Sequence, residues 1–207
     1  MPNRTWRQSL HPRIEQARSV LSQIDPEELA HRGGLDIGEA GLDVAFFGRT
    51  YLVRLPSFVA TDPATGEDCP EELQILLLDY LVNADGAHPT GRLIGFQELQ
   101  NGSFYRQAFQ GYSGNQLVQD LNGDVDAFRR AAQRMGGEPL DLGDAAFAFR
   151  ALPRMPLAVV WWAGDEEFPA EASVLFDETA AHYLPTDGLA ILGRMLCRKL
   201  AKSGRRT

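Results

Sequence analysis

Residues 152–177 hold the most concentrated mixture of apolar, aromatic and acidic side chains in the chain, and they read LPRMPLAVVWWAGDEEFPAEASVLFD. The charge-free run PLAVVWWA, residues 156–163, predicts a strand buried on both faces, because it is short for a helix and valine and tryptophan favour strands. Gly164 then lets the chain turn. The following VLF, residues 174–176, predicts a return to the interior. The stretch therefore predicts a core strand, an acidic corner and a second core segment.

Trp161 and Trp162 must point to opposite faces of this strand, because successive side chains alternate. One fills the core. The other is covered by a helix, or it lines a cleft as a stacking platform. We expect Trp161 in the core and Trp162 at the cleft, because Trp162 is nearer to Gly164, where the sheet ends.

The acidic corner consists of Asp165, Glu166 and Glu167. One interpretation is that all three carboxylates are solvated. The other is a cation site or a general acid–base pair, because oxygen ligands suit Mg²⁺ or Ca²⁺. Adjacent residues of an extended chain diverge, so Asp165 and Glu167 are the pair that face the same way. Asp177 is expected to cap a short helix over residues 178–184.

Composition narrows the class of protein. The 207 residues suit one domain, and a hydrophobic content of 44% is enough for a core. The net charge of −8 argues against a nucleic-acid-binding surface. The two cysteines, Cys69 and Cys197, are too far apart in the sequence to have metal-ligand spacing, and so few cysteines suit a protein of the reducing cytosol. Cys69 lies at the start of a predicted helix, where the helix dipole lowers the pKa of a thiol. No apolar run approaches a membrane span, and the N-terminus does not read as a secretory signal.

The N-terminal half predicts helices around a hairpin. Asp25 followed by Pro26 and Glu28 indicates a helix start, and a second helix covers residues 12–22. Residues 43–47 and 50–55 predict a β-hairpin that turns at Gly48 and Arg49. Asp68 is expected to cap an apolar, central helix over residues 71–83.

The C-terminal half continues with a strand over residues 92–99 and an aromatic, helical stretch that contains Phe104 and Tyr105, whose aromatic side chains either belong to the core or line a cofactor site. Asp124 is expected to cap a further helix. Residues 145–151 alternate like a half-buried strand, which we expect to pair antiparallel with residues 156–163. Because strands and helices do not alternate regularly, the order favours an α+β fold, with a mainly antiparallel sheet and several packing helices in a single domain. The expected division is an N-terminal helical segment (1–40), this domain (41–204) and a basic tail (205–207).

Known catalytic and nucleotide-binding motifs are absent from the sequence: it contains no G-x-G-x-x-G, no G-x-x-x-x-G-K-[ST], no H-E-x-x-H and no G-x-S-x-G. The histidines are scattered. His182 is the most interesting, since it follows Asp177 closely. It is either a structural histidine or an axial ligand to a tetrapyrrole, a role that histidine serves.

A family resemblance rests on QILLLDYLVNADG, on GRLIGFQEL with NGSFY after it, and on ALPRMPLAVVWWAGDEEFPAEASVLFDETAAHYLPTDGL. In these stretches the chain resembles the uncharacterised prokaryotic family catalogued as domain of unknown function 3786, from about Tyr51 to Leu192. Some relatives carry an N-terminal cysteine cluster of the iron–sulfur type, which this chain lacks. The resemblance implies an intracellular bacterial or archaeal protein, associated with redox or tetrapyrrole metabolism. It supplies no reaction and no catalytic residues.

Two hypotheses of function follow. The first is a cytoplasmic binding module that holds a small ligand, for example a tetrapyrrole, or a protein partner in a cleft beside residues 161–177. The second is an enzyme that uses Asp165, Glu167 and Asp177 as acid–base or cation-binding groups. Neither hypothesis includes nucleic acid or a membrane, and a purely structural subunit is a third reading. The candidate ligand-binding residues are Trp162, Asp165, Glu166, Glu167, Asp177, His182, Arg154 and Tyr105.

Overall fold

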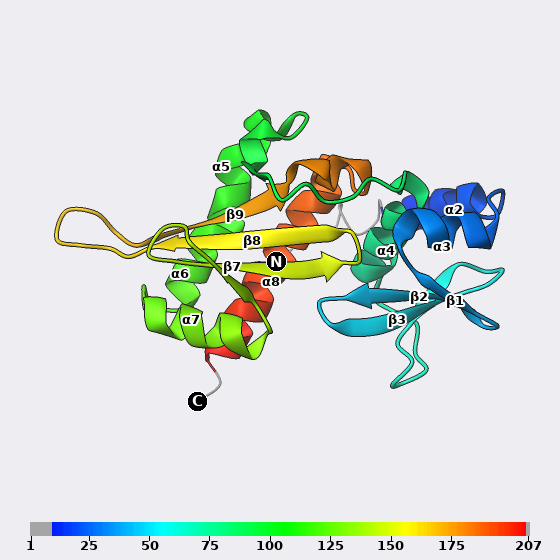
Figure 1. Ribbon diagram of the computed structural model, residues 1–207, viewed down its shortest axis with the longest axis horizontal. Helices are drawn as coiled ribbons and strands as arrows, with labels where there is room; N and C mark the ends of the chain where they lie inside the picture. Colours follow the sequence, from blue (N-terminus) through cyan, green and yellow to red (C-terminus); the bar gives the residue numbers. More distant parts are fainter. Residues whose placement is uncertain (1–9, 206–207) are drawn as a thin grey trace. The chain divides into compact units, whose positions relative to one another are not determined.

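The computed structural model describes residues 10–205, which group into two compact units (Figure 1). Unit 1 comprises the described residues up to His88 together with Leu152–Arg154 and His182–Pro185. Unit 2 comprises Pro89–Ala151, Met155–Ala181 and the described residues from Thr186 onward. Each unit has its own antiparallel sheet and its own helices, so the α+β class is confirmed, with the strands divided between two sheets.

The predicted boundaries at residues 40 and 204 stay a prediction, because compactness alone does not show which segments fold independently. Residues 1–9 of the helical segment and residues 206–207 of the basic tail lie outside the described residues.

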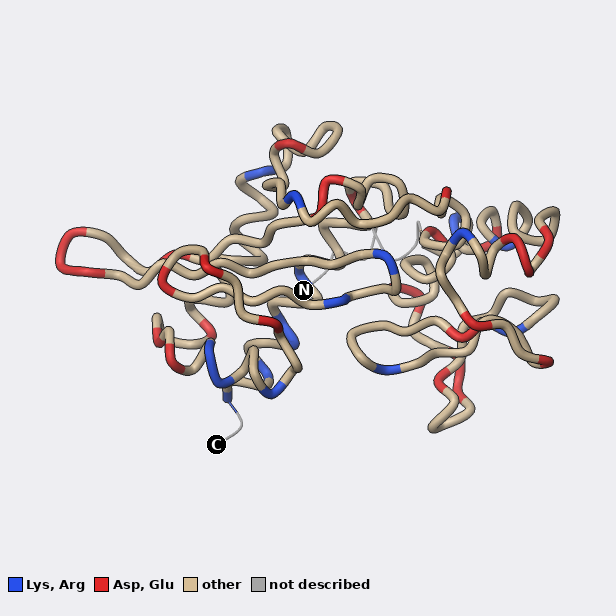
Figure 2. The backbone as a smooth tube through the Cα atoms, in the orientation of Figure 1, with Lys and Arg blue, Asp and Glu red and all other residues tan. Residues whose placement is uncertain are grey.

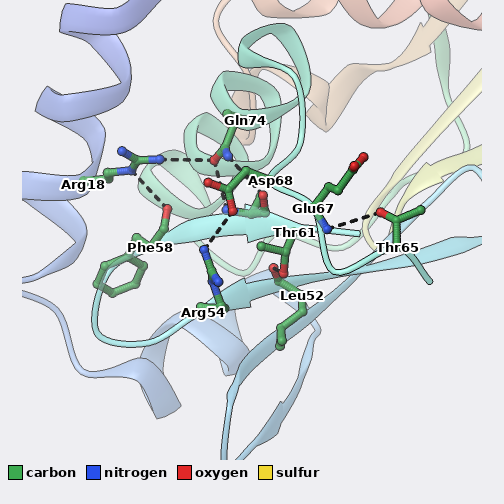
Figure 3. A network of polar contacts seen from close by, with 10 residues as sticks. Arg18, Leu52, Arg54, Phe58, Thr61, Thr65, Glu67, Asp68 and Gln74 are labelled. Carbon is green, nitrogen blue, oxygen red and sulfur yellow. Dashed lines mark hydrogen bonds and ion pairs between the residues drawn. The ribbon is translucent and has the colours of Figure 1, made fainter. Parts of the chain in front are cut away.

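Unit 1 is built around an apolar helix and a four-stranded meander. The buried helix α4 packs against α2 and α3, because it is apolar on most of its sides. Its Gln74 binds the backbone N–H and carbonyl of Ala60 on the edge strand (2.9 and 3.0 Å), and Arg18 contacts Gln74 in turn (Figure 3). These bonds give a buried amide the partners it needs. The elements are α2 (Leu10–Leu21), α3 (Pro26–Gly33), β1 (Asp36–Gly38), β2 (Gly41–Phe46), β3 (Arg49–Arg54), β4 (Val59–Thr61) and α4 (Glu71–Asn83).

The predicted helix caps and hairpin turn of unit 1 are correct in some details and wrong in others. Asp25 caps α3, as expected, by accepting the Glu27 N–H at 3.1 Å. The hairpin exists, but Phe46 pairs with Arg49, so its turn is Phe47–Gly48. Both turn residues have positive φ, which matches the twist of the flanking strands. Asp68 does not cap α4; it forms an ion pair with Arg54 at 2.8 Å, and Pro70 stands at the cap position (Figure 3).

Unit 2 has a five-stranded antiparallel sheet in the order β5-β9-β8-β7-β6. One face of the sheet is packed by helices, since Phe109 of α5 and Phe128 of α7 contact the side chains of Phe176 and Trp161. The strands are β5 (Leu93–Gly95), β6 (Glu138–Leu140), β7 (Ala145–Leu152), β8 (Met155–Trp162) and β9 (Glu171–Asp177). The helices are η1 (Phe96–Glu98), α5 (Gly102–Tyr112), α6 (Gly114–Asp120), α7 (Val125–Arg134), η2 (Glu178–His182) and α8 (Thr186–Gly204).

The predicted strand over residues 92–99 is shorter than expected. It ends at Gly95, because Glu98 accepts the Gly95 N–H at 2.7 Å and closes a short 3₁₀ turn. The next prediction is correct in part: α5 is helical, but Phe104 and Tyr105 are exposed and only Phe109 of its aromatic residues is fully buried.

The two tryptophans of β8 lie on opposite faces, as predicted. Trp161 is fully buried and stacks on Phe128, with ring centroids 5.3 Å apart. Trp162 is 41% exposed at the end of the strand. The core position of Trp161 is therefore confirmed, and the interpretation in which a helix covers the second tryptophan is wrong.

Candidate functional site

The predicted site residues fall into both units. Unit 2 contains Trp162, Asp177, Tyr105 and the acidic corner, residues 165–167. Unit 1 contains His182 and Arg154. We therefore describe the two sets separately.

The acidic corner is the tip of the long loop between β8 and β9 (Figure 2). Asp165 organises this loop, because its Oδ1 accepts the N–H groups of Glu167 (2.8 Å) and Phe168 (2.7 Å). These two hydrogen bonds hold the pKa of the Asp165 carboxyl below its ordinary value, since they stabilise the charged form. Gly164 permits the closure, because a Cβ there would lie 2.6 Å from the Ala170 nitrogen. The charge of Asp165 thus serves the shape of the loop.

Trp162 lies beside the loop that joins β6 to β7. The Asp144 N–H donates to the Trp161 carbonyl (2.9 Å), and the Ala163 N–H donates to the Asp144 carboxylate (2.7 Å). The same loop passes under the indole: a Cβ on Gly143 would lie 3.4 Å from the Trp162 Nε1. Both loops therefore meet at one end of the sheet.

This end of unit 2 combines exposed apolar side chains with carboxylates, and we call it the Trp162 end. Leu142 is 43% exposed and Phe168 is 67% exposed. Glu171 is the cross-strand partner of Trp162. Residues 135–149 and 155–193 contain no lysine or arginine, although Arg129 of α7 reaches the Asp144 carbonyl at 2.6 Å. The Trp162 end is defined by Leu142, Trp162, Phe168, Asp141, Asp144, Asp165, Glu166, Glu167 and Glu171.

Asp177 lies at the other end of β9 and is buried. Its carboxylate accepts the N–H groups of Thr90 (3.3 Å), Gly91 (2.7 Å) and Thr179 (3.0 Å) and the Thr179 hydroxyl (2.7 Å). Burial raises the pKa of Asp177, but these donors together outweigh burial, so its pKa is lower than the ordinary value. Its bond to Thr179 matches its predicted position at the start of η2. With four donors directed at its two oxygens, Asp177 is placed to hold backbone rather than to transfer protons.

His182 forms a pair with Asp85 in unit 1. Its Nδ1 lies 2.5 Å from Oδ2 of Asp85, and Asp85 also accepts the Ala87 N–H (2.9 Å). The hydrogen bond to His182 is the main cause of the lowered pKa of Asp85. About half of each side chain is exposed. An aspartate that holds one ring nitrogen leaves the other directed elsewhere, which is the arrangement of a general base.

Arg154 lies close to the same loop, residues 84–88, and binds mainly backbone. Its guanidinium donates to the carbonyls of Gly86 (3.0 Å) and His31 (3.2 Å) and lies 3.1 Å from the ring nitrogens of His88. The backbone N–H of Arg154 donates to the Tyr80 hydroxyl (3.2 Å), which in turn donates to the Gly33 carbonyl (2.6 Å). Arg154 and His182 are therefore brought to one loop, where Arg154 supports the backbone.

Cys69 does not behave as the helix-start position suggested. It is buried, and burial together with the nearby carboxylates of Asp62 and Asp68 raises its pKa to about 11. Cys197 is buried as well, and burial alone raises its pKa to about 12. Both thiols are free. The expected lowering is therefore wrong for Cys69, because loss of water opposes the thiolate.

Sequence reasoning missed several residues of these surroundings, above all Leu142, Asp144, Phe168 and Asp85. Leu142 and Asp144 stand in a Gly-containing connection between two strands, which is a turn signal, but only the pairing of β7 with β8 brings that turn beside Trp162. Nothing in the spacing of Asp85 and His182 links them. Tyr105 is 63% exposed on the first turn of α5.

Among the described residues, no group of three or more histidine, cysteine, aspartate or glutamate side chains is arranged to hold a metal ion. Within residues 10–205, no helix has the length and apolar character needed to cross a membrane.

Comparison with known proteins identifies the family. A family model described as Domain of unknown function (DUF3786) matches residues 25–199, which is most of the chain. The chain belongs to this family. The match confirms the resemblance seen in the sequence, and it covers all the candidate residues of both units. Searches of the curated proteins and of the solved structures found no match.

Proposed function

We propose that this DUF3786 chain is a binding module and that its contact surface is the Trp162 end of unit 2. The observation that carries the proposal is the 41% exposure of Trp162 at the end of β8, where two loops expose Leu142 and Phe168. Large exposed aromatic side chains on a rigid element are typical anchors of interfaces, where tryptophan is enriched. In this proposal the protein works in the cytoplasm of a bacterium or archaeon, as expected from the family resemblance.

A protein segment suits this surface better than a tetrapyrrole. The four histidines of the sequence all lie outside unit 2, so a tetrapyrrole beside Trp162 would find no histidine ligand within that unit. Tetrapyrroles also carry carboxylates, which the acidic loops would repel. The ligand in this proposal is therefore a partner protein.

Partner capture with matched variants tests the proposal. The tagged wild-type chain, Trp162→Ala and Phe104→Ala are each used to retain proteins from cells that naturally contain the chain. Phe104 is the control, because it is an exposed aromatic residue (84%) on α5. We expect the wild type and Phe104→Ala to retain the same partner and Trp162→Ala to lose it. Retention by Trp162→Ala at the wild-type level contradicts the proposal.

An enzyme remains the second candidate, and one contact favours it: Asp85 holds Nδ1 of His182 at 2.5 Å. In this version His182 is the general base. Asp165 and Asp177, which the sequence suggested as acid–base groups, accept several hydrogen bonds already. The sequence also suggested Asp165 and Glu167 as cation ligands, and thermal unfolding in Mg²⁺ or Ca²⁺ tests that role. Consumption of metabolites from a cell extract by the wild type, but not by His182→Gln, would support an enzyme; equal consumption would exclude this base.

A further inference from the structure

We infer that the partner at the Trp162 end is a lysine- and arginine-rich segment of another protein, extended across the two loops. This inference rests on the proposed function, because it specifies the chemistry of the segment that the same surface holds. It is carried by the combination of exposed apolar side chains with carboxylates on both flanking loops.

Charge complementarity is the first argument. Asp141 and Asp144 lie in the β6–β7 loop, and residues 165–167 lie at the tip of the β8–β9 loop (Figure 2). Lysine and arginine are absent from both loops, and Arg129 is the cation whose hydrogen bond to this end is described, through the Asp144 carbonyl. The negative charges of these carboxylates raise the affinity of this surface for a positively charged segment and the rate at which the two associate.

The aromatic residue supplies the second argument. A lysine ammonium or arginine guanidinium is attracted to the face of an indole, and tryptophan is the best aromatic partner for it. Glu171 lies directly across from Trp162 on β9, so a cation over the indole also meets a carboxylate. The aliphatic stems of lysine and arginine pack well on exposed apolar groups such as Leu142 and Phe168. An indole amid carboxylates therefore suits basic side chains better than apolar ones.

The spread of the carboxylates argues for a segment rather than a single ion. No group of three or more potential metal ligands is arranged around a point within the described residues. Asp165 accepts two backbone N–H groups of its own loop, and Asp144 accepts the N–H of Ala163 at the start of the β8–β9 loop, so these hydrogen bonds hold carboxylates of both loops at the Trp162 end. A chain with several cations along its length can contact both.

The probe is a synthetic nonalysine peptide, titrated into the whole chain by calorimetry at low and at near-physiological salt. Oligoglutamate of the same length is the negative control. The test variant replaces Asp165→Asn, Glu166→Gln and Glu167→Gln, and Asn at position 165 keeps an oxygen for the loop N–H groups. The matched control, Asp36→Asn, Glu39→Gln and Asp43→Asn, removes the same charge from exposed residues of unit 1. Unchanged melting temperatures verify folding.

We expect nonalysine to bind the wild type and the unit 1 control with similar Kd, and the loop variant about tenfold more weakly. The Kd should also rise with salt, because exposed charges are screened. Equal weakening in both variants overturns the inference, since attraction to net charge alone would explain it. Equal binding of oligoglutamate, or of the short polyamine spermine, also overturns it, as does self-association of the chain through Trp162. If partner capture still depends on Trp162 in any of these outcomes, the proposed function stands without the basic segment.

Discussion

Trp161 and Trp162 are chemically identical neighbours whose surroundings give them different energetic roles. We predict that Trp161→Ala lowers the free energy of unfolding by about 3–5 kcal/mol, because a fully buried aromatic side chain leaves a cavity. Trp162→Ala should cost about 1 kcal/mol or less, since water already reaches the indole. Denaturant unfolding of both variants measures the difference.

Trp161→Phe is the informative control for this comparison. The buried Nε1 of Trp161 has no hydrogen-bond partner among the described residues, so the phenylalanine variant loses packing but no hydrogen bond. It should be more stable than Trp161→Ala. Equal and severe losses for Trp161→Ala and Trp162→Ala would show that both faces of β8 are packed, and the exposed anchor would have to be given up.

Asp177 shows how one carboxylate holds several chain segments. Asp177→Asn should destabilise the protein by about 1–3 kcal/mol at pH 7, because an amide nitrogen cannot accept the Gly91 N–H. The folded pKa lies below the unfolded value of about 3.9, so the charged form contributes stability above that pH. This contribution disappears as the pH falls from about 4 through the folded pKa.

The measurement is the free energy of unfolding of wild type and Asp177→Asn between pH 7 and pH 2. The two curves should converge as the pH falls, because the wild-type carboxyl becomes neutral. A constant difference over this range would mean that the charge of Asp177 is not what holds Thr90, Gly91 and Thr179.

At the scale of elements, the connection between β7 and β8 contains Arg154. The planar guanidinium of Arg154 donates hydrogen bonds to the carbonyls of Gly86 and His31. We predict that Arg154→Ala destabilises unit 1 by about 1–3 kcal/mol, because bonds from a charged donor are lost. Arg154→Lys should not restore the stability, since one ammonium cannot reproduce the two-armed geometry. Hydrogen exchange of the residues 84–88 loop reports the effect.

The direction of the Arg154 result separates its two roles. Faster exchange in residues 84–88 for both variants fits a residue that supports backbone. Exchange unchanged in Arg154→Ala would contradict that role and return Arg154 to the ligand-binding candidates.

At the scale of the whole molecule, divalent cations are expected to leave stability unchanged. A ligand that binds only the native state raises the melting temperature, and no group of three potential ligands is arranged for a metal within residues 10–205. Thermal unfolding in millimolar Mg²⁺ or Ca²⁺ should therefore match that in chelator. A rise that Asp165→Asn with Glu167→Gln abolishes would instead establish the cation site.

The sequence by itself determined the class of fold and most of its elements. Alternation predicted β7, a short uncharged run predicted β8, and the distribution of apolar residues predicted α4 and α7, because these patterns record which sides of an element avoid water. The helix cap at Asp25 could also be predicted from the local sequence, since its side chain accepts the backbone N–H of a residue only two positions away. The paired tryptophans also followed from alternation alone, which put one of them on each face of β8.

Only the tertiary structure decided which distant groups meet. Asp85 and His182 are separated by 97 residues, and no local pattern joins them. The position of the β6–β7 loop beside Trp162 depends on the order of strands in the sheet, and the raised pKa of Cys69 depends on burial by other segments. The physical reason is common to all three: periodicity reports the exposure of a side chain within its own element, whereas neighbours and loss of water are set by packing between elements.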